Sequence, residues 1–365
     1  MGFSDYLTIF FLVFLVIGAI DKCLDNKFGF GEGFDRGFDC AGSLVVAMVG
    51  FTCFAPVFAG WLQPVLTPFF HWMGADPAMF AGLIVANDSG GFPLAMSLAE
   101  DPIAGCYSGL LVASIMGCLV MFTIPYGFAA ATREQRPLFI KGLLIGVVTV
   151  PLGLAAGGLF SGLTFAEWLC NTIPVLVISG ILTLCIWLIP NIIAKVMMVV
   201  ARILTVIVII TLVVAILDLK LPWIDIPNLV PYGDAILVIG EILIVLGGAF
   251  PFLTMVRKLF RKPLSRLAAK LDFNEDAMMG LLALPINALP TFAALPKMND
   301  RGIVVVTACA VSMDFVIGDH LAFTLSVRPD YVPMVMVGKI VGGLCGLFLA
   351  LWMTRPNKQK EKSQA

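Results

Sequence analysis

The residues with the clearest chemistry interrupt an apolar segment, residues 78–99, with the sequence Asn87-Asp88-Ser89-Gly90-Gly91. A carboxylate near the centre of a bilayer costs roughly 2.5–3.5 kcal/mol on insertion scales, so Asp88 requires a cation, a proton or a water-filled cavity beside it. The two glycines allow a turn and a close approach of a ligand to the backbone. The same residue types also suit a turn at the membrane surface. Because apolar residues flank the interruption on both sides, we favour a buried substrate-binding site.

A second interruption lies nearer the C-terminus, where Asp319 and His320 follow Gly318 in the apolar stretch 315–323. An adjacent carboxylate and imidazole can bind a cation or pass a proton. The alternative is that a membrane span ends early here and that Asp319 lies at a hydrated helix end, close to Arg328. We favour Asp319 and His320 as substrate-binding residues.

Asn287 is the third candidate, and it lies between Pro285 and Pro290 in a further apolar segment. The prolines interrupt the helical hydrogen-bond ladder, so this stretch offers an amide and free carbonyl groups to a substrate. A structural role at the tip of a helical hairpin explains the same residues equally well.

Two other carboxylates, Glu241 and Asp314, lie within apolar segments and rank lower as site residues. Either can join the site, or it can pair with a basic residue in a span, for which Lys339 and Arg202 are available. Both interpretations stay open at the level of sequence.

The composition identifies the class of protein in which these residues work. Of 365 residues, 60% are hydrophobic and 13% are charged, whereas soluble domains carry about 25% charged residues. This balance predicts an all-α, polytopic membrane protein. No nucleotide-binding P-loop, His-Glu-x-x-His or Gly-x-Ser-x-Gly motif occurs in the sequence, so we expect neither an enzyme nor a cofactor or metal. Nine cysteines without a Cys-x-x-Cys pair are expected to be small buried residues.

The apolar segments predict about nine spanning helices, because a helix needs about 20 apolar residues to cross a bilayer. The expected spans are residues 3–20, 42–60, 104–130, 139–162, 166–190, 192–217, 234–256, 302–326 and 331–353. Two further segments, 78–99 and 277–296, are broken by polar residues and prolines, and their arms are too short to span. Such breaks survive in a membrane only where they face protein or water. We therefore expect two re-entrant helical hairpins that do not cross.

The positions of the basic residues test this topology, since cytoplasmic loops are enriched in Lys and Arg. With nine spans and non-crossing hairpins, 19 of the 23 Lys and Arg residues fall on one side. That side is predicted to be cytoplasmic, with the N-terminus outside and the C-terminus inside. A crossing first hairpin would place the basic loop 21–41 outside, which disfavours it.

An internal repeat organises the chain. Pro64 to Met79 aligns with Pro263 to Met278, and each half then reads as two spans, a hairpin and two spans. We expect a first repeat at 1–165 and a second at 192–354, in inverted orientation as in many secondary transporters. The remaining ranges are expected to be a linker span at 166–191 and a disordered cytoplasmic tail at 355–365.

Several stretches together resemble one family. The sequences "AMVGFTCFAPVFAG", "GADPAMFAGLIVANDSGGFPLA", "SGLLVASIMGCLVMFTIP" and "GDHLAF" are similar to those of the ethanolamine-utilisation permease family, and the likeness extends over nearly the whole chain. The resemblance implies an ethanolamine permease of the bacterial inner membrane. It assigns Asp88, Gly90, Gly91, Asp319 and His320 to the motifs, and Asn287 less closely because the local Asn-Pro pattern differs.

The expected function is import of ethanolamine, a protonated small amino alcohol, by a facilitated or proton-coupled carrier. Asp88 and Asp319 are expected to bind the ammonium group, while Asn87, Ser89, Asn287 or His320 meet the hydroxyl. The alternative is a secondary transporter or channel for another small cationic or polar solute. A membrane enzyme or receptor-like scaffold lacks support, because no nucleophile and base are paired in sequence. The sequence leaves the oligomeric state open, including a homo-oligomer.

Overall fold

A computed structural model describes residues 2–355 of the chain, except the side chains of residues 260–269. Over this range the protein is all-helical and contains no strands. The α-helices are α1 (Phe3–Cys23), α2 (Gly31–Asp39), α3 (Ala41–Leu44), α4 (Gly50–Trp72), α5 (Met79–Ile84), α6 (Phe92–Leu98), α7 (Pro102–Cys106), α8 (Ile124–Ala130), α9 (Arg136–Gly158), α10 (Phe165–Leu188), α11 (Pro190–Lys220), α12 (Tyr232–Leu271), α13 (Glu275–Ala283), α14 (Ala288–Ala293), α15 (Asp300–Met313), α16 (Asp319–Val327) and α17 (Val332–Met353). Short 3-10 or π-helical segments are η1 (Val45–Val49), η2 (Asn87–Gly91), η3 (Tyr107–Gly117), η4 (Leu119–Thr123), η5 (Leu295–Lys297) and η6 (Pro329–Tyr331). The expected tail at 355–365 lies outside the described residues apart from Arg355.

Within the described residues, eight continuous helical stretches are long and apolar enough to cross a membrane. They are Phe3–Cys23, Gly31–Trp72, Pro102–Ala130, Arg136–Gly158, Phe165–Leu188, Pro190–Lys220, Tyr232–Leu259 and Pro329–Met353. Each contains or largely overlaps one of the spans expected from the sequence, so eight of those segments are helical over membrane-spanning lengths.

The ninth expected span, 302–326, is not one continuous helix. α15 ends at Met313, and α16 begins at Asp319 after a break over residues 314–318. Phe315 adopts a positive φ of 54°, which ends the helical path. The N–H group of Phe315 donates to Leu284 O at 3.1 Å. The N–H group of Ile317 donates to Pro285 O at 2.7 Å. These partners satisfy backbone groups that a break would otherwise expose to an apolar environment.

The first helical arm is longer than the sequence predicted. Residues 31–39, expected to lie in a cytoplasmic loop, form α2, and α4 continues through the expected loop 61–77 as far as Trp72. Glycines explain the close packing of α2: a Cβ at Gly37 would lie 2.6 Å from Gly247 Cα in α12. α2 therefore packs against α12 and α1 instead of forming an irregular loop.

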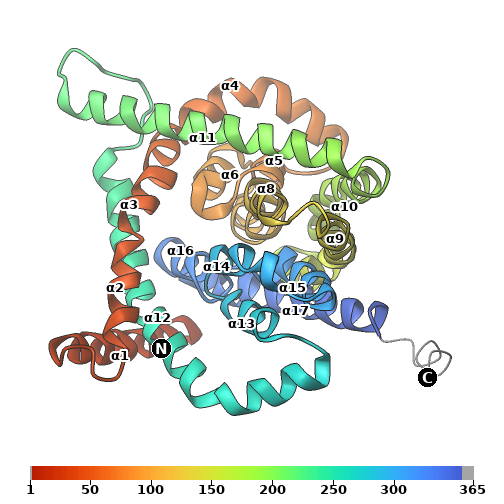
Figure 1. The fold of residues 1–365 in the computed structure, drawn as a ribbon. Helices are drawn as coiled ribbons and strands as arrows, with labels where there is room; N and C mark the ends of the chain where they lie inside the picture. The colour runs from red at the N-terminus through yellow and green to blue at the C-terminus, as the bar shows by residue number, and fades with distance from the viewer. Residues whose placement is uncertain (1, 356–365) are drawn as a thin grey trace.

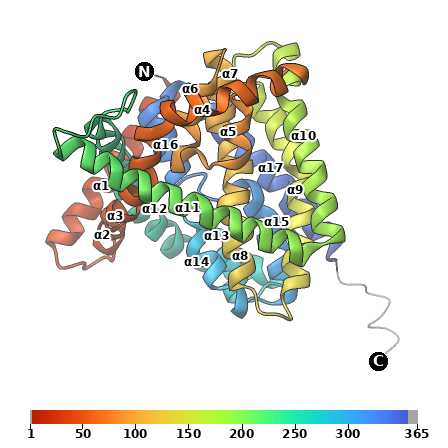
Figure 2. The ribbon, with the colours of Figure 1, turned by 90° about the horizontal axis from the view of Figure 1, so that it is seen from above.

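The helices form an outer group and an inner group (Figure 1). α1 to α4, with α10 to α12, curve around α5 to α9 and α13 to α17. Within the inner group, α9, α15 and α17 pack against one another most extensively. The perpendicular view also shows α10 beside α9, and α11 running across the inner helices (Figure 2).

The first broken segment begins and ends at the same place. α5 leads through extended residues Val85 and Ala86 into η2 and α6. The Asp76 carboxylate accepts the N–H groups of Glu100 at 3.0 Å and Asp101 at 2.9 Å, which ties the two ends together. Both arms, of 6 and 7 residues, are too short to cross a bilayer.

The second broken segment closes in a comparable way. α13 and α14, of 9 and 6 residues, are separated by residues 284–287. Asn274 Nδ2 donates to Lys297 O at 2.6 Å, and Asn299 N–H donates to Asn274 Oδ1 at 3.3 Å. The start and end of this segment therefore also lie together.

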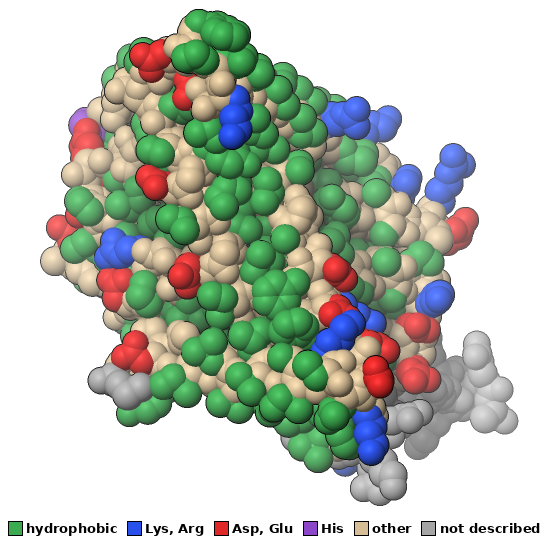
Figure 3. All heavy atoms as spheres, turned by 90° about the vertical axis from the view of Figure 1, so that its left-hand side faces the viewer, with side chains coloured by type: hydrophobic (Ala, Val, Ile, Leu, Met, Phe, Trp, Pro, Cys, Tyr) green, Lys and Arg blue, Asp and Glu red, His purple; other side chains and the backbone are tan. Residues whose placement is uncertain are grey.

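The outer face of the molecule is apolar. Figure 3 shows broad areas of hydrophobic side chains on one face. Large exposed hydrophobic residues occur along α1 and α11, including Val13, Val16, Ile203 and Ile210. In a chain with this many long apolar helices, such surfaces suit contact with lipid.

Candidate functional site

Asp88 and Asp319 come from the two interrupted regions and lie in one part of the inner group. η2, which contains Asp88, packs against α16, which begins at Asp319. The rings of Phe92 and Phe323 meet edge to face across this contact, with centroids 5.9 Å apart. The two carboxylates lie close enough for their charges to interact. The structure therefore brings these two predicted site residues together.

Neither carboxylate is neutralised by a basic side chain that the structure describes. Asp88 and Asp319 are both half-buried, and none of the described salt bridges includes them. The hydroxyl of Ser89 donates to Asp88 Oδ1 at a long 3.3 Å. Two carboxylates that interact in an apolar protein, with no described salt bridge and with Lys339 as a basic group whose charge reaches Asp88, form a cation-attracting position.

Asn87 and His320 supply unsatisfied polar atoms beside these carboxylates in sequence. Asn87 is fully buried, and its Oδ1 and Nδ2 atoms have no hydrogen-bond partner among the described residues. His320 is also buried, and its Nδ1 atom has no hydrogen-bond partner among the described residues. Its ring packs on Phe315, with the ring centroids 5.3 Å apart. Buried polar groups are nearly always hydrogen-bonded, so unsatisfied ones indicate sites where a polar ligand or water is accepted.

Gly90 and Gly91 are required by the local backbone. Gly90 has φ +104°, and a Cβ there would lie 2.2 Å from Phe51 Cδ1. A Cβ at Gly91 would lie 2.4 Å from Val85 O. The close approach that the glycines permit is therefore made by the protein itself, and it sets the turn that presents Asp88.

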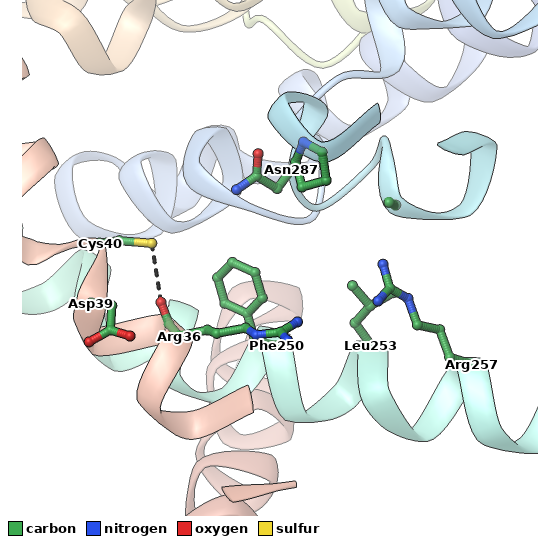
Figure 4. Close-up of a pocket in the computed structure, with 9 residues that line it drawn as sticks. Arg36, Asp39, Cys40, Phe250, Leu253, Arg257 and Asn287 are labelled. Carbon is green, nitrogen blue, oxygen red and sulfur yellow. Dashed lines mark hydrogen bonds between the residues drawn. The ribbon is translucent and has the colours of Figure 1, made fainter. Parts of the chain in front are cut away.

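Asn287 lies in the wall of a cavity of about 320 Å³ between the outer and inner groups. Figure 4 shows its side chain opposite α2 and α12, facing the region of Arg36 and Phe250. Its Oδ1 atom accepts the N–H group of Leu289 at 2.9 Å and so caps α14. Cys40, in the same cavity wall, is within range of the charge of Asp319. Asn287 thus has a structural role at the hairpin tip and also borders a cavity whose wall residue Cys40 is within range of the Asp319 charge.

Asp314, ranked low from the sequence, is fully buried and paired with Lys339 across 3.1 Å. Lys339 Nζ also donates to Ser114 O at 2.5 Å. The second carboxylate oxygen of Asp314 accepts from Thr123 Oγ1 at 2.9 Å and from Cys118 Sγ at 3.2 Å. The pairing with Lys339 was one of the two alternatives that the sequence left open. Ser114, Cys118 and Thr123 gave no signal, because small polar residues are common in apolar helices.

Glu241, the other low-ranked carboxylate, is exposed on α12 and forms none of the described salt bridges. α12 packs against α16, but the exposed Glu241 side chain makes no described contact with Asp88 or Asp319 that would support a role in the site.

Comparison with known proteins gives a consistent result over the full chain. The model of a family described as "Ethanolamine utilisation protein, EutH" matches residues 3–353. A probable ethanolamine permease EutH of Listeria monocytogenes is 36% identical over 367 residues, covering 100% of this chain and 98% of that protein. A probable ethanolamine permease EutH of Salmonella typhimurium is 35% identical, with 97% and 96% covered. The uncharacterised protein YxeR of Bacillus subtilis is 34% identical, with 100% and 98% covered. No solved structure gives a significant match.

Proposed function

The chain belongs to the EutH family of ethanolamine utilisation proteins, and we propose that it imports protonated ethanolamine across the bacterial cytoplasmic membrane. The protein is a multi-pass membrane protein of a permease family and is not an enzyme.

The chemistry of the substrate matches the candidate site. Ethanolamine is a primary amine, and like the lysine side chain, with a reference pKa of about 10.4, it is an ammonium ion at neutral pH. A desolvated ammonium needs a carboxylate to replace its hydration, and the hydroxyl group needs polar partners. We assign the ammonium to Asp88 and Asp319, and the hydroxyl to polar groups among Asn87, Ser89, Asn287 and His320.

One observation supports this assignment most strongly. Asp88 and Asp319 interact with each other's charge but with no described basic side chain within salt-bridge distance. Asp314, which is more deeply buried, already has Lys339 as its counter-ion. Only the first two carboxylates therefore have the capacity to accept a cationic substrate.

The fold suggests how such a site reaches both sides of the membrane. We place the N-terminus outside and the C-terminus inside, with residues 78–99 and 277–296 as re-entrant hairpins within inverted repeats at 1–165 and 192–354. The closed ends at Asp76 and Asn274 support this placement, because each broken segment returns to its starting point. In this arrangement the polar interruptions of the two hairpins meet near the midplane of the membrane, where transporters of this architecture bind substrates.

The mechanism that we propose is a carrier in which the inner group moves relative to the outer group. The cavity beside Asn287 separates α2 and α12 from α13 and α14, so it marks a boundary across which such movement is possible. A membrane potential favours inward movement of a cation by about 2.3 kcal/mol per 100 mV. Facilitated diffusion is therefore sufficient for accumulation, and proton coupling through Asp319 and His320 is the alternative.

Uptake of radiolabelled ethanolamine into proteoliposomes tests the proposal. At mildly acidic pH the neutral amine is scarce, so leakage through the lipid is small. We expect saturable uptake that depends on the protein and is competed by unlabelled ethanolamine. Uptake no faster than in protein-free liposomes would refute the substrate assignment, whereas protein-dependent but non-saturating flux would indicate a channel.

A further inference from the structure

The pair formed by Asp314 and Lys339 has no role in substrate binding as proposed above, yet it is the most deeply buried ion pair among the described residues. Both side chains are completely inaccessible. Every oxygen of the Asp314 carboxylate has a donor, and Lys339 has a second acceptor in Ser114 O. Buried ion pairs are costly to desolvate and seldom increase stability relative to apolar residues. The contacts of this pair therefore raise the question of what it positions.

Two chain breaks matter for the ammonium site: the first is the turn at residues 85–91, which carries Asp88, and the second is the stretch 314–318, which precedes Asp319. Asp314 is the residue at which the second break starts. It follows the last residue of α15, its backbone turns to φ −57° and ψ 140°, and the chain then reaches Asp319 through residues 315–318. On the other side, the break is held by the hairpin: a Cβ at Gly318 would lie only 1.9 Å from Ile286 O. The direction in which Asp319 leaves this break therefore depends on how Asp314 is anchored.

The other hydrogen-bond partners of the Asp314–Lys339 pair lie on the stretch that supports the first break: Cys118 and Thr123 donate to Asp314, and Ser114 O accepts from Lys339. Ser114, Cys118 and Thr123 belong to the helical region 102–130. In the same region, a Cβ at Gly117 would lie 2.2 Å from Val85 O, and Met121 Sδ accepts the Ala86 N–H group at 3.2 Å. Val85 and Ala86 immediately precede the turn that carries Asp88. One carboxylate thus connects the second break to the support of the first.

Lys339 is held as firmly as its partner. A Cβ at Gly338 would lie 3.1 Å from Gly153 O in α9, and one at Gly342 would lie 2.8 Å from Ser312 Oγ in α15. These contacts fix the backbone of α17 on both sides of Lys339. The Lys339 ammonium also lies close enough to Asp88 and His320 for its charge to act on both.

We propose that Asp314 and Lys339 are positioning residues for the ammonium site, because their ion pair fixes the second break to the support of the first and so holds Asp319 opposite Asp88. This inference rests on the proposed function for its kinetic consequences, although its geometric consequence is independent of any substrate. The pair itself does not contact ethanolamine.

The kinetic test uses variants that avoid an unpaired buried charge. Asp314→Asn/Lys339→Met removes both charges together, and Asp314→Glu keeps both but lengthens the carboxylate side chain by one methylene. We expect each variant to insert normally and to raise KM for ethanolamine about tenfold or more, with kcat changed less than about threefold, because ground-state binding is what a displaced carboxylate loses. The matched control is Lys22→Met/Asp35→Asn, which removes an exposed ion pair and should leave KM unchanged.

The geometric test uses Phe92→Cys/Phe323→Cys, since these rings lie 5.9 Å apart between η2 with α6 and α16. A short bis-maleimide should link the two positions, identified by peptide mass spectrometry, and the yield should fall at least about threefold when Asp314→Asn/Lys339→Met is added. A wild-type KM and an unchanged cross-link in either charge-pair variant would overturn the positioning role. Wild-type protein that links normally but fails to transport ethanolamine would instead contradict the proposed function alone.

Discussion

The carboxylate of Asp76 accepts the backbone N–H group of Asp101 at 2.9 Å, across the full length of the first broken segment. The same carboxylate accepts the N–H groups of Glu100 and Ala78, at 3.0 and 2.8 Å. One side chain therefore closes α5 and α6 into a unit whose tip carries Asp88. The Asn274 and Asn299 side chains form the corresponding hydrogen bonds at the base of α13 and α14.

Replacing Asp76 by alanine should loosen the first hairpin. Three N–H groups lose their acceptor, and we expect a destabilisation of about 1–3 kcal/mol, seen as a lower melting temperature of the detergent-solubilised protein. Asp225→Ala, at an exposed position, is the control and should have little effect. Equal melting temperatures for Asp76→Ala and the wild type would show that the hydrogen bonds of Asp76 do not stabilise the protein.

The contribution of Asp76 should also depend on pH. Burial raises the pKa of the Asp76 carboxyl, and the N–H groups of Asp101, Ala78 and Glu100 oppose that rise. Because the pKa of this carboxyl is higher in the folded state than in the unfolded state, the folded protein binds more protons here between the two pKa values. The stability difference between wild type and Asp76→Ala should therefore be largest in acid, shrink as the pH rises through the folded pKa and stay constant above it. Melting curves from pH 3 to 8 measure this, and a difference that grows with pH would contradict the assignment.

Gly90 should not tolerate a side chain. Gly90→Ala would place a Cβ 2.2 Å from the ring of Phe51 at φ +104°, and we expect loss of transport together with a destabilisation of about 1–3 kcal/mol. Gly240→Ala is the matched control, since a Cβ there meets nothing within 4 Å. Transport rates for both variants, normalised to the amount of inserted protein, distinguish the two outcomes. A Gly90→Ala protein as active as the Gly240→Ala protein would mean that the turn is not constrained.

Transport of an ammonium ion by a uniporter should respond to the membrane potential. An inside-negative potential of 100 mV favours accumulation by about 2.3 kcal/mol, or roughly fifty-fold at equilibrium. Potassium gradients with valinomycin impose the potential in proteoliposomes, and labelled ethanolamine measures the accumulation. Reversing the potential should abolish accumulation. Accumulation that ignores the potential but follows an imposed pH gradient would favour electroneutral exchange of ethanolamine for a proton.

A covalent link between the outer and inner groups should stop the carrier. Leu253 in α12 and Ala283 in α13 both line the cavity beside Asn287, so Leu253→Cys/Ala283→Cys places two thiols across the boundary. We expect uptake to cease after cross-linking and to return when a cleavable linker is reduced. The same variant before cross-linking is the control. Full uptake in a completely linked sample would exclude movement at this boundary.

The sequence predicted the helical membrane fold and the locations of the interruptions because both follow from hydrophobicity and from a few polar residues. The positions of Asp88 and Asp319 were evident for the same reason: a carboxylate in an apolar run is conspicuous. An interruption at 315–323, with Gly318 before Asp319 and His320, was also expected, but the segment 302–326 was expected to be one span, and the structure divides it at residues 314–318. This break depends on long-range hydrogen bonds to Leu284 and Pro285.

The counter-ion of Asp314 could not be chosen from the sequence. The sequence offered Lys339 and Arg202 as counter-ions, and hydrophobicity alone cannot choose between residues on different helices. In the structure Lys339 lies on α17, which packs directly against α15. The helical state of residues 31–39 was also missed, because four glycines in that stretch or next to it, Gly29, Gly31, Gly33 and Gly37, suggest a loop. Gly33 and Gly37 permit close packing on α12, and Gly31 permits close packing on Lys22 of α1, which local sequence does not reveal.

Equilibrium binding of labelled ethanolamine to the purified protein tests the central claim most directly. The wild type should bind with a measurable Kd. Asp88→Asn and Asp319→Asn should each weaken binding at least about thirtyfold, since losing one member of a desolvated charge pair costs 2 kcal/mol or more. Glu241→Gln, which removes an exposed carboxylate from α12, should bind like the wild type. Unchanged affinity in both aspartate variants, with the fold intact, would contradict the claim that these two carboxylates form the ammonium site.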